Sequence, residues 1–222
     1  MCSIPHFCYL GHMPSKGEQT REAILRAAID RFGREGFRAT SVADVARDAG
    51  VGGTVPYAYF PNKDALFLAA VDEDAAALIG EGLALLDADP TPLAWRRNLG
   101  ITLFVALEHH PLTRRLLAGL EPDVSARVME IPALAELRNA VAERLAAEQL
   151  TGNVRTDIDV VPIANGVVAL VLSLLTSLTL IGGDVVGAYA DDVIAVFDAA
   201  LSPPSDCCGA TKARPQGTGP SY

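Results

Sequence analysis

A carboxylate and two imidazoles stand side by side where Glu108, His109 and His110 precede a proline. These residue types could serve acid/base chemistry or hold a metal ion. Consecutive residues on a helix point about 100° apart, however, and no clear third partner accompanies the two histidines. We expect no catalytic residue here and a protein that is not an enzyme. A helical enzyme that uses His109 or His110 is the alternative.

The cysteines all lie in the two terminal tails. The N-terminal pair and two nearby histidines combine ligand types of zinc, but their spacing fits no standard finger, so we expect neither a metal site nor a cofactor. Residues 1–17 are predicted to be a disordered leader, with the start of translation at Met1 or Met13 left open. Residues 203–222, rich in Pro, Gly and Ser, are predicted to be a disordered tail. The residues concerned are Cys2, His6, Cys8, His12, Cys207 and Cys208.

The charge of the chain is distributed unevenly. The formal net charge is −9, which at first argues against a nucleic-acid ligand, because DNA must be neutralised by Lys and Arg. Residues 14–66 nevertheless hold eight Lys and Arg against seven Asp and Glu, whereas residues 67–222 hold ten against twenty. If the protein binds DNA, its N-terminal quarter does so. No signal peptide precedes this part, so we expect a cytoplasmic location.

The composition favours packed helices, because half of the residues are hydrophobic and few of those are aromatic. Apolar spacing predicts a first helix that starts with Thr20 as its N-cap and ends at Gly36, with Phe37 folded back onto it. A second, very short helix follows Ser41, whose hydroxyl can cap it while Asp44 completes a capping box. Gly50 ends that helix, and another short helix after the turn would complete a helix-turn-helix.

The rest of the chain predicts an all-α second domain. Asn62 is a candidate N-cap, and prolines mark the later breaks. The predicted helices cover residues 65–86, 93–110, a short segment from Pro111, 133–150, 161–181 and 184–201.

One of these helices carries no charge between Asp159 and Asp184 and is long enough to cross a bilayer. Both flanking residues are acidic, and the segment lacks an aromatic belt, which favours a helix buried between other helices. A helix that is apolar on nearly all sides needs a partner subunit to cover part of it. A membrane-anchored regulator that uses residues 160–183 as a span is the alternative.

The segment TREAILRAAIDRFGREGFRATSVADVARDAGV, followed by YAYFPNKDALF, resembles the DNA-binding domain of the TetR family of transcriptional regulators over residues 20–67. The resemblance implies a DNA-binding domain at residues 18–66 and an effector-binding and dimerisation domain at residues 67–202. It further implies a homodimer, joined by its last two helices, on a near-palindromic operator with half-sites about 34–36 Å apart or multiples of that. A repressor released from DNA by a small-molecule effector is the expected function.

The resemblance also assigns residues to the DNA contact. Thr40 and Ser41 match phosphate-contacting positions, and Lys63 matches a lysine whose charge, at a helix N-terminus, favours phosphate. Tyr57 is expected to reach the DNA backbone or a base edge, while Tyr59 packs or contacts phosphate.

The sequence departs from the family pattern at residues 52–56. Gly52 and Gly53 leave few side chains to read bases, so Thr54 becomes the main candidate, with its hydroxyl for a base edge and its methyl for thymine. Because Pro56 has no N–H, the recognition helix should begin no earlier than about Gly52 or Gly53. DNA shape is then expected to carry more of the specificity.

The effector pocket is implied mainly by the family. We expect it among the large or polar residues of otherwise apolar helices, each of which could equally be part of the core. These residues are Trp95, Phe104, Met129 and Asn165.

Overall fold

The computed structural model describes residues 15–88, 94–121, 131–181 and 183–203 of the chain. Over these residues it is all helical, as predicted. Two of the elements, η1 and η2, are 3₁₀ turns. The elements are α1 (Lys16–Ala39), α2 (Val42–Asp48), η1 (Val55–Ala58), α3 (Lys63–Ala88), α4 (Ala94–Ala106), η2 (Leu107–His109), α5 (Pro111–Leu117), α6 (Pro132–Leu150), α7 (Val160–Ile181) and α8 (Gly183–Leu201).

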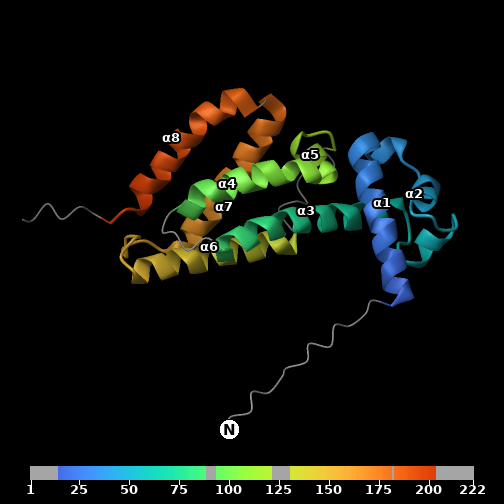
Figure 1. The fold of residues 1–222 in the computed structure, drawn as a ribbon, viewed down its shortest axis with the longest axis horizontal. Helices are drawn as coiled ribbons and strands as arrows, with labels where there is room; N and C mark the ends of the chain where they lie inside the picture. The colour runs from blue at the N-terminus through green and yellow to red at the C-terminus, as the bar shows by residue number, and fades with distance from the viewer. Residues whose placement is uncertain (1–14, 89–93, 122–130, 182, 204–222) are drawn as a thin grey trace, which may run out of the picture.

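The long helix α3 connects the two ends of the molecule (Figure 1). At one end it packs against α1, beside which α2 and η1 lie, and further along it packs against α4 and α6. α7 packs on α6, and α8 packs on α7. α5 lies between α1 and α3, although it follows α4 in the chain.

The buried side chains form two hydrophobic cores. The N-terminal core joins α1 and α2 to the first half of α3, up to Ala75. The C-terminal core begins at Leu78 of the same helix and continues through α4, α6 and α7. Leu112 and Leu116 of α5 belong to the N-terminal core, although they are distant from it in sequence. α3 therefore belongs to both cores, and a boundary at residues 66 and 67 remains a prediction.

The first helix begins earlier than predicted. Ser15 is its N-cap and forms a full capping box, because its hydroxyl accepts from the Glu18 N–H at 3.2 Å while its own N–H donates to the Glu18 carboxylate at 2.6 Å. Thr20 lies one turn inside the helix and donates its hydroxyl to the Lys16 carbonyl. Residues 15–17, predicted as part of the leader, form this N-cap and first turn.

Gly36, where the first helix was predicted to end, interrupts α1, which continues to Ala39. Its φ of +83° and ψ of 171° are not helical, and a glycine adopts them at low cost. The turn brings Phe37 back onto the helix, where its ring lies 6.2 Å from that of Phe32 and 4.9 Å from that of Phe67, measured between centroids.

The later helices lie close to their predicted positions. Asn62 caps α3 by accepting the Ala65 N–H at 2.8 Å, and Pro111 opens α5 as predicted. α7 passes the length and hydropathy test for a membrane span, with a mean hydropathy of 2.0, and 28% of that segment is buried. The predicted leader before residue 15, the cysteines and Met129 lie outside the described residues.

Candidate DNA-binding surface

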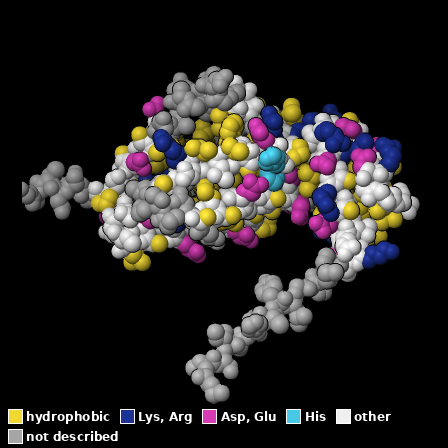
Figure 2. Space-filling model, in the orientation of Figure 1, with side chains coloured by type: hydrophobic (Ala, Val, Ile, Leu, Met, Phe, Trp, Pro, Cys, Tyr) yellow, Lys and Arg dark blue, Asp and Glu magenta, His cyan; other side chains and the backbone are white. Residues whose placement is uncertain are grey.

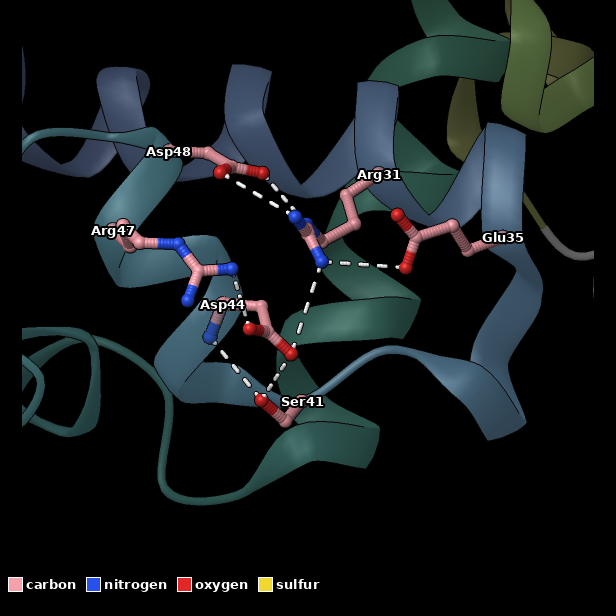
Figure 3. Close-up of polar contacts among 6 residues, drawn as sticks. All are labelled: Arg31, Glu35, Ser41, Asp44, Arg47 and Asp48. Atoms are coloured by element: carbon pink, nitrogen blue, oxygen red, sulfur yellow. Dashed lines mark hydrogen bonds and ion pairs between the residues drawn. The ribbon is translucent and has the colours of Figure 1, made fainter.

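A network of ion pairs fixes α2 against α1 (Figure 3). The Arg31 guanidinium donates through Nε to Asp48 at 2.6 Å and lies 3.3 Å from the Glu35 carboxylate and 3.7 Å from that of Asp44. The hydrogen bond from Arg31 to Asp48 raises the pKa of this guanidinium further above its ordinary value. The position of α2 on α1 is therefore set by charge pairing as well as by apolar packing.

The start of α2 is capped by its own side chains. The Ser41 hydroxyl accepts the Asp44 N–H at 3.2 Å and donates to the Asp44 carboxylate at 2.6 Å. This is half of the predicted capping box, because the carboxylate bonds to the hydroxyl and not to a backbone N–H. The bond from Ser41, with smaller contributions from Arg47 and Arg31, holds the pKa of Asp44 below its usual range.

The predicted recognition helix is present as a single 3₁₀ turn, and it begins after Gly53 as predicted. The N–H groups of Val55 and Tyr57 donate to the carbonyls three residues earlier, Gly52 and Thr54, at 2.9 and 3.2 Å. Pro56 has no N–H to extend this pattern and lies in the first turn of η1. Two glycines before it further disfavour a regular helix.

Five of the predicted DNA-contacting residues lie on the exposed surface of this region. Tyr57 is the largest of them, with 53% of its area exposed. Gly53 lies in open space, because an added Cβ there would meet nothing within 4 Å. The exposed residues are Ser41, Gly52, Gly53, Thr54 and Tyr57.

The other three predicted residues are less accessible. Thr40 is only 2% exposed, so the structure places its side chain in the core and not at the surface. Tyr59 is half-buried, with its hydroxyl near the first turn of α1 at Gly17. Lys63, the first residue of α3, holds its Nζ 4.3 Å from the centre of the Phe37 ring, a cation–π distance.

Basic side chains lie at this end of the molecule, interspersed with acidic ones (Figure 2). Arg26 and Arg47 are exposed, and the Arg21 guanidinium lies 5.5 Å from the ring centre of Phe60, which is buried. The sequence predictions did not include these arginines, although the local charge balance was the signal that pointed to this quarter of the chain. The surface therefore combines a protruding tyrosine with cations that can contact phosphate.

The predicted effector residues do not share one environment. Trp95 is fully buried in the C-terminal core, where its indole N–H donates to Glu148 at 2.8 Å. Phe104 is 38% exposed, and Asn165 lies on the exposed side of α7. These three residues therefore differ in how far they are exposed. Their proposed role as a pocket remains a prediction.

The family model "Bacterial regulatory proteins, tetR family" matches residues 24–70. The transcriptional repressor KstR2 of Mycolicibacterium smegmatis is 27% identical over 154 residues, 66% of this chain and 73% of KstR2. The uncharacterized regulator YdgC of Bacillus subtilis is 27% identical over 174 residues, 77% and 86% of the two chains. FadR of Bacillus subtilis, solved in complex with stearoyl-CoA, has a similar fold, with a TM-score of 0.62 and 17% identity over 81% of this chain and 98% of FadR.

A capped helix pair with an exposed turn, joined to a larger helical domain, defines a DNA-binding transcriptional regulator of the helix-turn-helix class. The matched motif and the relatives that extend over most of the chain identify the family. The chain belongs to the TetR family of transcriptional regulators.

Proposed function

We propose that this regulator is a homodimeric repressor that acts in the cytoplasm and leaves its operator when a small-molecule effector binds the C-terminal domain. The observation that carries the proposal is the exposed helix-turn-helix end, which has Tyr57 and several Lys and Arg side chains at its surface. KstR2, a relative that matches over most of its length, is a transcriptional repressor.

Each protomer presents its exposed turn to one operator half-site. Thr54 is the base-reading candidate, and Tyr57 and Ser41 contact the backbone. Gly52 and Gly53 allow the chain to approach DNA closely, and Lys63 reaches phosphate if it leaves the Phe37 ring. Tyr59 mainly supports the turn from behind. We omit Thr40 from this contact set because its side chain is buried.

The dimer forms through α7 and α8. The exposed side of α7 carries large apolar side chains, and such an area is unusual on a soluble monomer. A bundle of four helices across a two-fold axis covers it. The exposed residues are Val161 (55%), Leu170 (46%), Leu180 (60%) and Ile181 (64%) on α7, with Val196 (67%) on α8.

The alternative of a membrane anchor is weaker. Val167, Val168, Val171 and Leu175 of α7 pack into the C-terminal core against α6, so this helix is part of the fold on one side. Membrane insertion would remove these side chains from the core. A partner subunit accounts for the exposed side and leaves the core intact.

The enzyme alternative is also weaker. His110 is 7% exposed and hydrogen-bonded to two carboxylates, whereas His109 is exposed on η2. The two histidines do not form one site. The described residues contain no group of three or more His, Cys, Asp or Glu suited to a metal ion.

The effector is proposed to be a small, largely apolar molecule. The FadR structure, similar in fold, holds stearoyl-CoA, and another protein of similar fold is a gamma-butyrolactone receptor. An effector needs to shift the operator affinity by only about 1–3 kcal/mol, which a change in separation or tilt of the two exposed turns can supply.

Gel-shift titration with DNA from upstream of the gene tests the proposal. We expect binding at low salt, competition by operator but not by scrambled duplex, and weaker binding of Lys63→Ala to every sequence. Thr54→Ala should reduce the preference for the operator while retaining non-specific binding. Equal affinity for all duplexes would contradict a sequence-specific regulator.

A further inference from the structure

The imidazole of His110 lies between two carboxylates of α3, just before α5 begins. Its Nδ1 is 3.0 Å from Asp74 Oδ1, and its Nε2 is 3.2 Å from Glu81 Oε1. Asp74, 3% exposed, uses its other oxygen to accept the backbone N–H and the hydroxyl of Thr113, at 2.7 and 2.9 Å. Three polar groups thus tie the first turn of α5 to the middle of α3.

These partners specify the protonation of the ring. An ionised carboxylate only accepts hydrogen bonds, whereas a neutral imidazole has one donor nitrogen and one acceptor. Both contacts of His110 are therefore satisfied only when the ring is an imidazolium. The bond to Asp74 is the main cause that raises the pKa of His110, burial opposes it, and Glu81 adds to it.

No other charged group contacts this ring among the described residues. Glu108 and His109 on η2 and Arg114 on α5 point to solvent. α7, which also packs on α5, carries no charge, and α1 faces the junction through a glycine.

The first turn of α5 is in turn packed tightly on α1. A Cβ added at Gly33 would lie 2.8 Å from the Pro111 Cβ and 3.0 Å from the Leu112 backbone nitrogen. The backbones of α1 and α5 are so close here that a shift of α5 would move α1 as well, because close-packed interiors deform little. Pro111, the residue after His110, therefore contacts α1 directly, so a shift of His110 would change the position of α1 at the DNA-binding end.

We propose that the His110 imidazolium is a positioning group for operator binding: it holds α5 on α3 and thereby keeps α1 and α2 in the orientation that fits DNA. The proposal rests on the operator-binding function above. Loss of the proton removes one of the two bonds and turns a lone pair toward a carboxylate. Because the folded pKa is raised, the contacts are complete below about pH 6.5 and are lost as the pH rises through that pKa.

The test compares operator affinity between pH 6 and pH 9 in the full-length wild type, His110→Gln and the matched control His109→Gln. Glutamine can still donate one hydrogen bond but does not titrate. Fluorescence anisotropy with the upstream duplex should show about a tenfold loss of affinity with rising pH in the wild type and the control. His110→Gln should have a flat profile. The same pH profile in all three proteins would overturn the proposal.

A second variant and a measurement without DNA guard against misfolding. Glu81 has a half-exposed side chain, so Glu81→Gln removes one partner charge with little effect on the core and should move the midpoint to lower pH. NMR titration of the His110 imidazole should give a pKa above the ordinary value of a histidine. A His110 pKa at or below that ordinary value would overturn the proposal. A raised His110 pKa without specific DNA binding would instead overturn the proposed function, and with it this role in DNA binding.

Discussion

The Thr40 hydroxyl is buried and has no hydrogen-bond partner among the described residues. An unsatisfied buried hydroxyl lowers the free energy of unfolding by about 1–3 kcal/mol, and the packing of the Thr40 methyl group must offset this loss. Ser41, the next residue, is exposed and caps α2. Both residues have extended backbone angles, and an extended chain directs successive side chains to opposite sides. Two adjacent hydroxyls therefore have different roles.

Tyr57 is exposed and Tyr59 is half-buried, so we expect substitution by Phe to have different effects at the two positions. Tyr57→Phe removes an exposed hydroxyl that can donate to phosphate, and we expect about tenfold weaker operator binding. Tyr59→Phe is the matched control, because that ring is half-buried beside α1 and should keep its packing without the hydroxyl. Anisotropy titrations of both variants measure the difference. An equal loss in both would assign the two tyrosines the same role.

Some residue-level contacts could not be predicted because their partners are far apart in sequence. Arg96 pairs with Asp198, 102 residues later, at 2.7 Å, and lies 3.9 Å from Glu148. Burial lowers the pKa of Arg96. The charge of Arg96 predicts a surface residue, and only the packing of α4, α6 and α8 places it inside.

Local sequence signals predicted the helices well where they act within one turn. Asn62 before Lys63, and Pro111 at the start of α5, each work through the backbone groups that a helix end leaves free. The start of α1 was missed because Ser15 and Thr20 are both good caps. The apolar spacing begins after both of them, so only the observed capping box separates them.

The second helix of the helix-turn-helix was predicted as a short helix, and it is a 3₁₀ turn of four residues. The motif correctly located the segment, but Pro56 and the two glycines before it reduce the helix that can form there. The DNA-contacting set was predicted through family resemblance. Which of its members face solvent depends on the packing of α3 against α1, which no local pattern encodes.

At the level of helices, the contact between α1 and α5 gives a prediction. Gly33→Ala places a methyl group against Pro111 and should cost about 1–3 kcal/mol, because neither backbone can move freely. Gly80→Ala is the matched control, since it lies in a helix with open space around it and should stabilise by about 0.4–1 kcal/mol. Urea unfolding of both variants measures whether the free energy of unfolding falls in Gly33→Ala and rises in Gly80→Ala. A stable Gly33→Ala variant would show that α5 can move away from α1.

For the whole molecule, the exposed side of α7 predicts an obligate dimer. Leu170→Glu combined with Leu180→Glu should produce monomers that bind the operator at least about tenfold more weakly, because two half-sites are no longer bound together. Asn139→Glu is the control, at an exposed polar position of α6, outside the proposed interface. Sedimentation velocity measures the oligomeric state. A dimeric double variant would place the interface elsewhere.

The leucines that α5 contributes to the N-terminal core have a consequence for protein engineering. Leu112 and Leu116 lie among the side chains of α1, α2 and α3, so the DNA-binding domain is completed by residues from the regulatory half of the chain. A fragment that ends within α3 would expose the apolar surface that these leucines cover. Chimaeras that exchange operator specificity between relatives must therefore transfer the matching face of α5 together with the helix-turn-helix.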